Sequence, residues 1–262
     1  MEECDTMAED YRGILNPREG FRHFRLARRK PAADLAWCLE RHWIVEWDLP
    51  ESEPYPAQIL PAPTFHLVVE EDGTWLYGVG ASRFERRIAG RGRVVGTKFR
   101  PGGAHPLIGA PAWRYTDRSL RAREALGADV PERESVDEQV GATEAFLRER
   151  LPEPDDTVAR IGAVVATMEA SPAISVEEVA ARHGVSVRTL QRLFRRWVGV
   201  TPKWVLQRFR LQEAAERVDE IGADDAAATA VELGYYDQAH FINDFRDMLG
   251  TTPGEYASSH GS

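Results

Sequence analysis

The sequence predicts a multidomain α and β protein, with a β-rich N-terminal part and an all-α C-terminal domain of two helix-turn-helix units joined by a long helix. Three observations lead to this prediction. Short apolar segments with strand periodicity fill residues 21–99, and the last hundred residues have helical periodicity with clear start and stop signals. The start and stop signals of those helices are then repeated once along the chain.

The length and composition are typical of a soluble chain with two domains. The chain has 262 residues, of which 43% are hydrophobic and 29% charged, so a substantial core can form. No apolar run approaches the roughly 18 residues of a membrane span, and the acidic first ten residues differ from a signal peptide. We therefore expect a cytoplasmic protein without membrane contact. Cys4 and Cys38 form no CxxC motif, which argues against a disulfide framework or a zinc finger.

The N-terminal part is expected to form an antiparallel sheet, as a sandwich or small barrel with helices. Strands are predicted at 41–47, 65–70, 74–79 and 93–99, with a hairpin turn at Asp72-Gly73, because both residues tolerate positive φ. Helices are expected around 32–40 and at 138–150. The polar residues 1–20 are expected to be a mobile segment. A proline-punctuated acidic joint at 152–156 predicts the boundary between domains at 21–152 and 153–262.

Capping residues predict the helices of residues 153–262. Ser175 and Glu178 form a capping-box pattern before a helix that stops at Gly184. Ser186 is placed as the N-cap of the next helix, which ends at Gly199. Thr201-Pro202 then begins a longer helix that ends at Gly222, because proline is well tolerated at the first helical position.

The same pattern returns after Gly222. An alanine-rich segment ends at Gly234, Asp237 is placed as the cap of the following helix, and Gly250 ends it before Thr252-Pro253. Corresponding residues of the two units lie 51 apart, namely Leu190 and Phe241, Phe194 and Phe245, Gly199 and Gly250, and Thr201 and Thr252. The two helix-turn-helix units are therefore expected at about 175–199 and 225–250.

The second helix of the first unit has a face that suits DNA. Its apolar residues share one side, which leaves the opposite side to Arg188, Gln191, Arg192 and Arg195. Arginine and glutamine can pair bidentately with guanine or adenine edges in the major groove. The net charge of -9 argues against nucleic acid, but residues 179–212 contain no acidic residue and eight Arg or Lys. An ordinary solvated helix face is the alternative, and the repeated Gly turns argue against it.

These segments resemble a known family. GVSVRTLQRLFRRWVGVTPKWVL and ELGYYDQAHFINDFRDMLGTTPGEY resemble the two units of the C-terminal domain of AraC/XylS transcription regulators, over about a hundred residues. The resemblance implies a one-component regulator, not an enzyme, whose two recognition helices meet successive major-groove faces of double-stranded DNA. RNA polymerase, a small-molecule effector and a second copy of the chain are possible further partners. The implied DNA-binding residues are Arg188, Thr189, Gln191, Arg192, Arg195, Arg196, Gln238, His240, Asn243 and Arg246.

The N-terminal part fits the place of the sensor or dimerisation domain that such regulators usually carry. WIVEWDLP, ILPAP and RGRVVGTKFRPGG resemble an uncharacterised N-terminal domain found in some of them. Candidate ligand contacts in an apolar pocket are Trp43, Trp47, His66, Trp75 and Tyr77, with sheet core as the alternative. No cofactor and no metal is expected, because no second ligand stands at a metal-binding spacing from His66.

The two recognition helices differ in their DNA chemistry. At the 51-residue offset, Ala239 replaces Arg188 and Asn243 replaces Arg192, and acidic residues stand at 237, 244 and 247. We therefore expect the first unit to read bases and the second mainly to position the protein. An enzyme or repair protein with a fused DNA-binding module is the alternative function. It would need a nucleophile, and Cys38 has no evident activating base.

Overall fold

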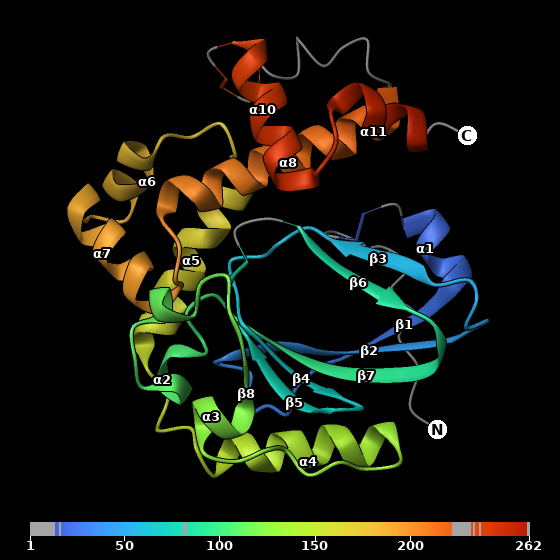
Figure 1. The fold of residues 1–262 in the computed structure, drawn as a ribbon. Helices are drawn as coiled ribbons and strands as arrows, with labels where there is room; N and C mark the ends of the chain where they lie inside the picture. The colour runs from blue at the N-terminus through green and yellow to red at the C-terminus, as the bar shows by residue number, and fades with distance from the viewer. Residues whose placement is uncertain are drawn as a thin grey trace.

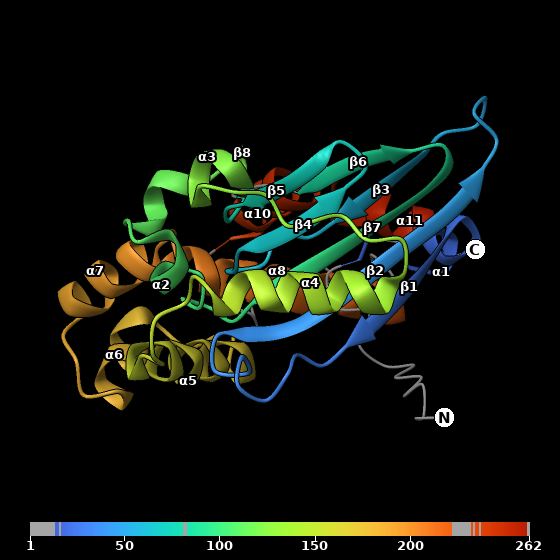
Figure 2. The same cartoon turned by 90° about the horizontal axis from the view of Figure 1, so that it is seen from below.

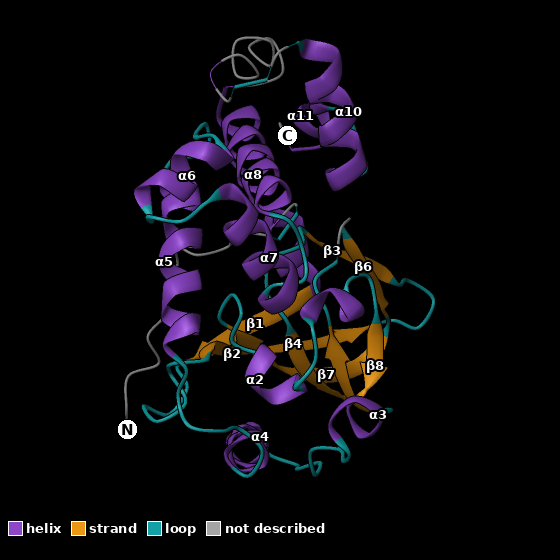
Figure 3. Cartoon of the chain, turned by 90° about the vertical axis from the view of Figure 1, so that its left-hand side faces the viewer, coloured by secondary structure: helices purple, strands orange, loops and turns teal. Residues whose placement is uncertain are grey.

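The computed structural model describes residues 14–15, 17–80, 83–221, 232, 234–235 and 237–260. Its N-terminal part is built around antiparallel strands and its C-terminal part from helices, as the separate orange and purple regions of Figure 3 show. The predicted fold class is therefore confirmed. Most of residues 1–20, Cys4 included, and most of the expected first helix of the second unit lie outside the described residues.

The N-terminal part begins with a short helix and continues as strands with short helices between and after them. In chain order its elements are α1 (Pro17–His23), β1 (Phe24–Arg29), β2 (Leu39–Leu49), β3 (Tyr55–Ile59), β4 (His66–Glu70), β5 (Gly73–Tyr77), β6 (Phe84–Ile88), β7 (Gly90–Phe99), α2 (His105–Ile108), the 3-10 helix η1 (Ala112–Tyr115), β8 (Ser119–Arg121), α3 (Ala122–Leu126) and α4 (Val136–Arg148). The predicted strands correspond to β2, β4, β5 and β7, and the helix predicted at 138–150 corresponds to α4.

Six strands form one antiparallel sheet in the order β1-β2-β7-β4-β5-β8, while β3 and β6 pair separately. The β3–β6 pair lies over one face of the larger sheet in Figure 1, and α4 lies across the other face in Figure 2. His42 anchors α4, because its Nδ1 and Nε2 lie 2.8 Å from Thr97 Oγ1 and 3.2 Å from Glu144 Oε1. The sheet therefore has one face covered by a helix and one face turned toward the two-stranded ribbon.

Glycines of β7 make room for the tryptophans of β2. Trp43 pairs with Gly96 and Trp47 with Gly92 in the antiparallel register. A Cβ atom on either glycine would overlap the indole ring of its partner. The two rings can therefore lie flat on β7, on the face that β3 and β6 cover.

One local prediction is wrong, and a second is correct only in part. Residues 33–38 form turns rather than a helix, and β2 already begins at Leu39. The backbone carbonyl of Cys38 accepts a hydrogen bond from Arg100 N at 2.8 Å, so pairing with the end of β7 replaces helical hydrogen bonds there. The hairpin between β4 and β5 is present, but its register pairs Glu70 with Gly73. Gly73 alone takes a positive φ, of 125°, and Asp72 does not.

The C-terminal part consists of α5 (Asp156–Ala170), α6 (Val176–Arg182), α7 (Val187–Trp197), α8 (Pro202–Ile221), α10 (Gln238–Leu249) and α11 (Pro253–His260). One buried apolar cluster runs from the sheet to α5, α6, α7 and α8 and includes Phe99, Ile161 and Phe194. A second cluster joins Leu60 after β3 to Phe241 and Phe245 of α10. Both helix-turn-helix units therefore pack against the N-terminal part.

Candidate nucleic-acid interface

The first helix-turn-helix unit consists of α6, a glycine turn and α7. Ser175 and Glu178 form the predicted capping box, and Gly184 takes a left-handed φ of 63° in the turn. Ser186 Oγ accepts a hydrogen bond from Thr189 N at 3.1 Å, which caps α7. Leu190 and Phe194 are fully buried, so the apolar face of α7 packs inward as predicted. This packing fixes the direction in which the opposite face of α7 points.

The opposite face of α7 presents its cations and glutamine to solvent. The exposed side chains are Arg188, Gln191, Arg192, Arg195 and Arg196. Thr189 is half-buried, and its hydroxyl lies 2.9 Å from Ser186 Oγ, so it belongs partly to the cap. At 1.5 Å per residue, the row from Arg188 to Arg195 extends over about 10 Å of the helix axis. That row has the size and chemistry of a major-groove contact.

The second unit repeats this geometry in the residues that the structure describes. Asp237 Oδ1 accepts a hydrogen bond from His240 N at 2.7 Å and caps α10. Gly234 and Gly250 both have a φ of 79°, and they follow Gly184 and Gly199 of the first unit by 50 and 51 residues. The exposed polar side chains of α10 include Gln238, His240, Asn243 and Arg246. The described residues confirm the predicted duplication of capping and turn positions.

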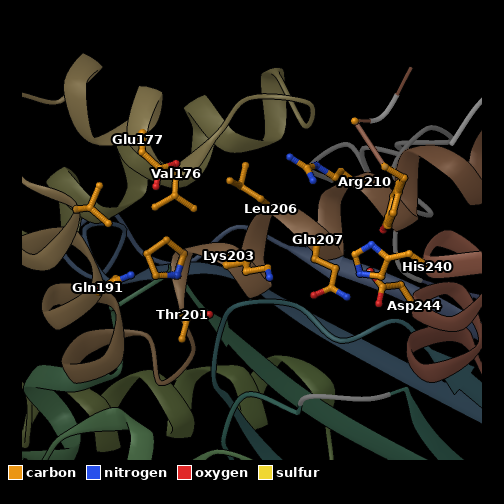
Figure 4. A pocket seen from close by; sticks show the side chains of 14 residues that line it. Val176, Glu177, Gln191, Thr201, Lys203, Leu206, Gln207, Arg210, His240 and Asp244 are labelled. Carbon is orange, nitrogen blue, oxygen red and sulfur yellow. The ribbon is translucent and has the colours of Figure 1, made fainter. Parts of the chain in front are cut away.

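A groove of about 510 Å³ lies between the two units, with α8 as its floor (Figure 4). Gln191 of α7 and His240 of α10 line it from opposite ends, and Lys203 and Gln207 of α8 lie between them. His240 Nε2 is 3.4 Å from Asp244 Oδ2, so an acidic side chain lines the end formed by α10. Sequence reasoning did not assign Gln207 to this surface. Gln207 follows Lys203 by four residues, about one helical turn, so the spacing alone predicts that the two side chains share one face of α8.

Two cations of the acid-free stretch 179–212 are used inside the fold. Arg208 is 5% exposed, and its Nε donates to the carbonyl of Pro61 at 2.9 Å. Arg210 donates from Nε to the carbonyl of Pro172 at 2.7 Å and from Nη2 to that of Ile174 at 3.2 Å. Charge segregation along the sequence therefore overstates the basic surface available to DNA.

The C-terminal end of α7 contacts the N-terminal part. The guanidinium carbon of Arg195 lies 5.2 Å from the ring centroid of Trp113 in η1. Arg196 Nε donates to His105 Nε2 at 3.4 Å, and the His105 ring meets Trp197 edge-on at 4.1 Å. Burial holds the pKa of His105 below its ordinary value. These contacts place η1 and α2 directly beside α7.

The five candidate ligand contacts all lie on β2, β4 and β5. Every indole N–H of the three tryptophans is satisfied within the protein, by His66 Nδ1, the Ala89 carbonyl and Asp72 Oδ1 in chain order. Tyr77 donates to Glu70 Oε1 at 2.7 Å, and its ring meets Phe84 of β6 at 5.8 Å. Burial, with Lys98 and Arg41 nearby, lowers the pKa of His66 to about 3. All five residues are half-buried, so their rings remain partly accessible.

The described residues give little support to a reactive cysteine, a metal site or a membrane-spanning helix. Cys38 is fully buried, and burial raises the pKa of its thiol to about 12, so it is held in the protonated form. Within the described ranges, no three side chains of His, Cys, Asp or Glu are arranged to hold a metal ion. The helices that the structure describes are too short or too polar to cross a membrane.

Comparison with known proteins matches two segments of the chain to protein families. Residues 179–259 match a helix-turn-helix domain, and residues 27–121 match a domain of unknown function, DUF6597. The HTH-type transcriptional activator RhaS of Escherichia fergusonii is 33% identical over 114 residues, which cover 42% of this chain and 41% of the relative. A probable thc operon regulatory protein of Rhodococcus erythropolis is 31% identical over 121 residues, which cover 44% and 36%. The chain therefore matches about two fifths of the length of these relatives.

The chain is also similar to several solved structures. One of them is a transcriptional regulator with an AraC-type DNA-binding domain from Chromobacterium violaceum, which is 24% identical and covers 40% of this chain and 94% of that chain with a TM-score of 0.37. The helix-turn-helix match at residues 179–259 includes the glycine turns and the helix caps that the structure repeats. Residues 179–259 therefore carry a helix-turn-helix domain similar to that of transcription regulators such as RhaS, and residues 27–121 match a domain family of unknown function.

Proposed function

We propose that the protein is a sequence-specific DNA-binding transcription regulator whose N-terminal domain binds a small-molecule effector. The observation that supports this proposal best is the pair of capped helices α7 and α10 at either end of one groove, each with a polar, exposed face. Two such helices can enter successive major-groove faces of one DNA site. Family membership of the C-terminal domain supports the same function.

The two units are proposed to contribute unequally. On α7, Arg188, Gln191 and Arg192 are exposed and able to pair with base edges. On α10, Asn243 and Arg246 are exposed, while His240 is paired with Asp244 and Asp247 adds a further exposed negative charge. Negative charge near phosphate weakens binding. We therefore assign base readout mainly to α7 and positioning on the phosphate backbone mainly to Gln238, His240, Asn243 and Arg246 of α10.

The effector is proposed to bind between the sheet and the β3–β6 ribbon. Trp43, Trp47 and Tyr77 are half-buried there, and Phe84 of the ribbon is 41% exposed. Their N–H and O–H groups are already hydrogen-bonded within the protein, so the ring faces are what they offer to a ligand. This favours an apolar or aromatic effector. For the alternative of a fused enzyme, Cys38 offers no reactive nucleophile, since its thiol is buried and protonated.

Selection from random DNA tests the proposed function. The full-length protein is incubated with a library of random duplexes of about 30 base pairs, which exceeds two helical turns. We expect enrichment of a shared sequence whose affinity falls as salt rises. Arg192→Ala should remove the base preference at one or two positions of the selected DNA sequence and leave the preference at its other positions unchanged. Failure of the full-length protein to enrich any sequence would overturn the proposal.

Ligand binding is tested by thermal shift of the full-length chain, because its apolar core extends from the sheet into the helical domain. A bound effector stabilises the folded state and raises the melting temperature. We expect hydrophobic or aromatic metabolites to raise it in the wild type and less in Trp43→Leu. A flat response to every class, together with a stable dimer in light scattering, would favour a purely dimerising domain.

A further inference from the structure

The exposed segment 113–118 of the N-terminal domain lies against the C-terminal end of α7 and is rich in arginine. Its sequence, WRYTDR, contains Arg114 and Arg118 with Asp117 as its one carboxylate. Both arginines are exposed, and so is Trp113, with 44% of its surface accessible. No sequence motif marks this segment, and its position beside α7 arises only in the folded chain.

The contact that holds this segment on α7 is well packed. Thr116 Oγ1 donates to the carbonyl of Gly199 at 2.8 Å, directly after α7. Ala112 is fully buried in the same cluster as Phe194 and Val198. A Cβ atom on Gly199 would lie 3.1 Å from Thr116 Oγ1 and 3.2 Å from the Ala112 carbonyl oxygen. The position of η1 relative to α7 is therefore fixed by close packing and a partly buried hydrogen bond.

Arginines of the segment and of α7 gather around one ring. The guanidinium carbons of Arg195 and Arg114 lie 5.2 Å and 5.8 Å from the centroid of Trp113. Arg118 Nη1 donates to the Arg114 carbonyl at 3.4 Å, so it belongs to the same cluster. Within the described part of the chain, none of these three arginines forms an ion pair with a carboxylate. A cluster of exposed guanidinium groups on a protein of net charge -9 suits an anionic partner.

The cluster continues the row of α7 beyond the helix. Arg188, Arg192 and Arg195 follow one another along α7, and Arg195 meets Trp113 at the end of that row. Base contacts of a recognition helix come mainly from its N-terminal residues. The C-terminal end of α7 and the adjacent η1 therefore suit the phosphate backbone, which arginine binds through charge and paired N–H groups.

We infer that residues 113–118 of the N-terminal domain extend the DNA surface of α7 and bind backbone phosphates beside the base pairs that α7 reads. This inference rests on the proposed function. It assigns a DNA contact to the domain of unknown function itself, through Arg114 and Arg118, with Trp113 positioning Arg195. The contact adds affinity without sequence preference.

The double variant Arg114→Ala/Arg118→Ala tests the inference in the full-length protein. The matched control is Arg25→Ala/Arg91→Ala, which removes one exposed arginine of β1 and one at the start of β7. It gives the same change in net charge as the test variant. The backbone groups of Arg114 and Arg118 retain their hydrogen bonds in the test variant, so it should fold. Binding to the duplex selected by the wild type is measured by fluorescence anisotropy between 50 and 200 mM salt. Phosphate contacts are mapped in parallel by ethylation interference.

Loss of two phosphate contacts lowers the slope of log affinity against log salt by about 1.8. The affinity of the double variant should therefore fall about tenfold less than that of the wild type over this fourfold salt range. Interference at phosphates next to the base pairs read by Arg192 should disappear, and the control should behave as the wild type. An unchanged slope, or tighter binding by the double variant, with normal wild-type binding would overturn this inference and leave the proposed function standing. Absence of wild-type binding to any duplex would overturn the proposed function itself.

Discussion

Ser186 and Asp237 occupy equivalent positions, 51 residues apart, and cap α7 and α10 in the same way. Ser186 Oγ accepts the amide of Thr189 at 3.1 Å, and Asp237 Oδ1 accepts that of His240 at 2.7 Å. A cap needs an oxygen acceptor, and both side chains supply one. Only Asp237 adds a negative charge, at the N-terminal end of α10, which is proposed to approach DNA.

The cap and the charge at Asp237 can therefore be separated by mutation. Asp237→Ser should keep the cap while removing repulsion from phosphate, so DNA affinity should rise with little change in stability. Asp237→Ala should remove the cap and lower the free energy of unfolding by about 1 kcal/mol. Chemical denaturation and anisotropy titrations measure the two effects. Equal or weaker DNA binding by Asp237→Ser would show that its charge does not oppose the contact.

Gly199 and Gly184 provide a matched pair for the interdomain contact. Both have positive φ, of 103° and 63°, but only Gly199 has atoms of η1 around the position of a Cβ. Gly184→Ala should cost about 1–2 kcal/mol of stability for its left-handed backbone. Gly199→Ala should cost more, because Thr116 and Ala112 must also move. Denaturation of both variants checks this, and an equal cost would mean that the contact between η1 and α7 yields easily.

Stability should fall in acid partly because of His66. Its pKa is about 3 in the folded protein against 6.5 for an ordinary histidine, so below pH 6.5 the unfolded chain binds a proton that the folded chain excludes. The free energy of unfolding therefore decreases as pH falls from 6.5 toward 3, by about 1.4 kcal/mol per unit for this one group. His42 and His105 also have lowered pKa values and act in the same direction.

His66→Gln removes the contribution of His66 to this pH dependence. In urea denaturation of wild type and variant between pH 7 and 4, the free energy of unfolding should fall less steeply with decreasing pH in the variant. Parallel curves would mean that His66 is protonated as readily in the folded protein as in the unfolded chain.

Sequence patterns found the C-terminal helices because each begins and ends with a residue whose chemistry is local. Ser175, Ser186 and Gly250 act through hydrogen bonds or φ values within a few positions of themselves. The helix predicted around 32–40 is absent, although the apolar composition of this segment suits one. The backbone of Cys38 instead pairs with that of Arg100, 62 positions away. β3 was missed because it is short and contains Pro56, which fits only the edge pairing with β6.

The surface for DNA was predicted in part. The exposed row of α7 follows from helical spacing, but the burial of Arg208 depends on the carbonyl of Pro61 and cannot be read locally. The position of Trp113 beside Arg195 likewise depends on tertiary packing between distant segments. For the ligand contacts, the alternation of apolar residues along β2 predicts that Trp43 and Trp47 share one face. The role of Gly92 and Gly96, which leave room for the two rings, follows only from the pairing of β2 with β7.

The most direct test of the account compares Arg192→Ala with Asn243→Ala, which occupy equivalent positions on α7 and α10. Both side chains are exposed, so neither change should alter folding. Anisotropy titrations with the selected duplex should show a loss of about 1–3 kcal/mol for Arg192→Ala and a smaller loss for Asn243→Ala. A larger loss for Asn243→Ala, or no loss for Arg192→Ala, would contradict the assignment of α7 as the helix that reads DNA.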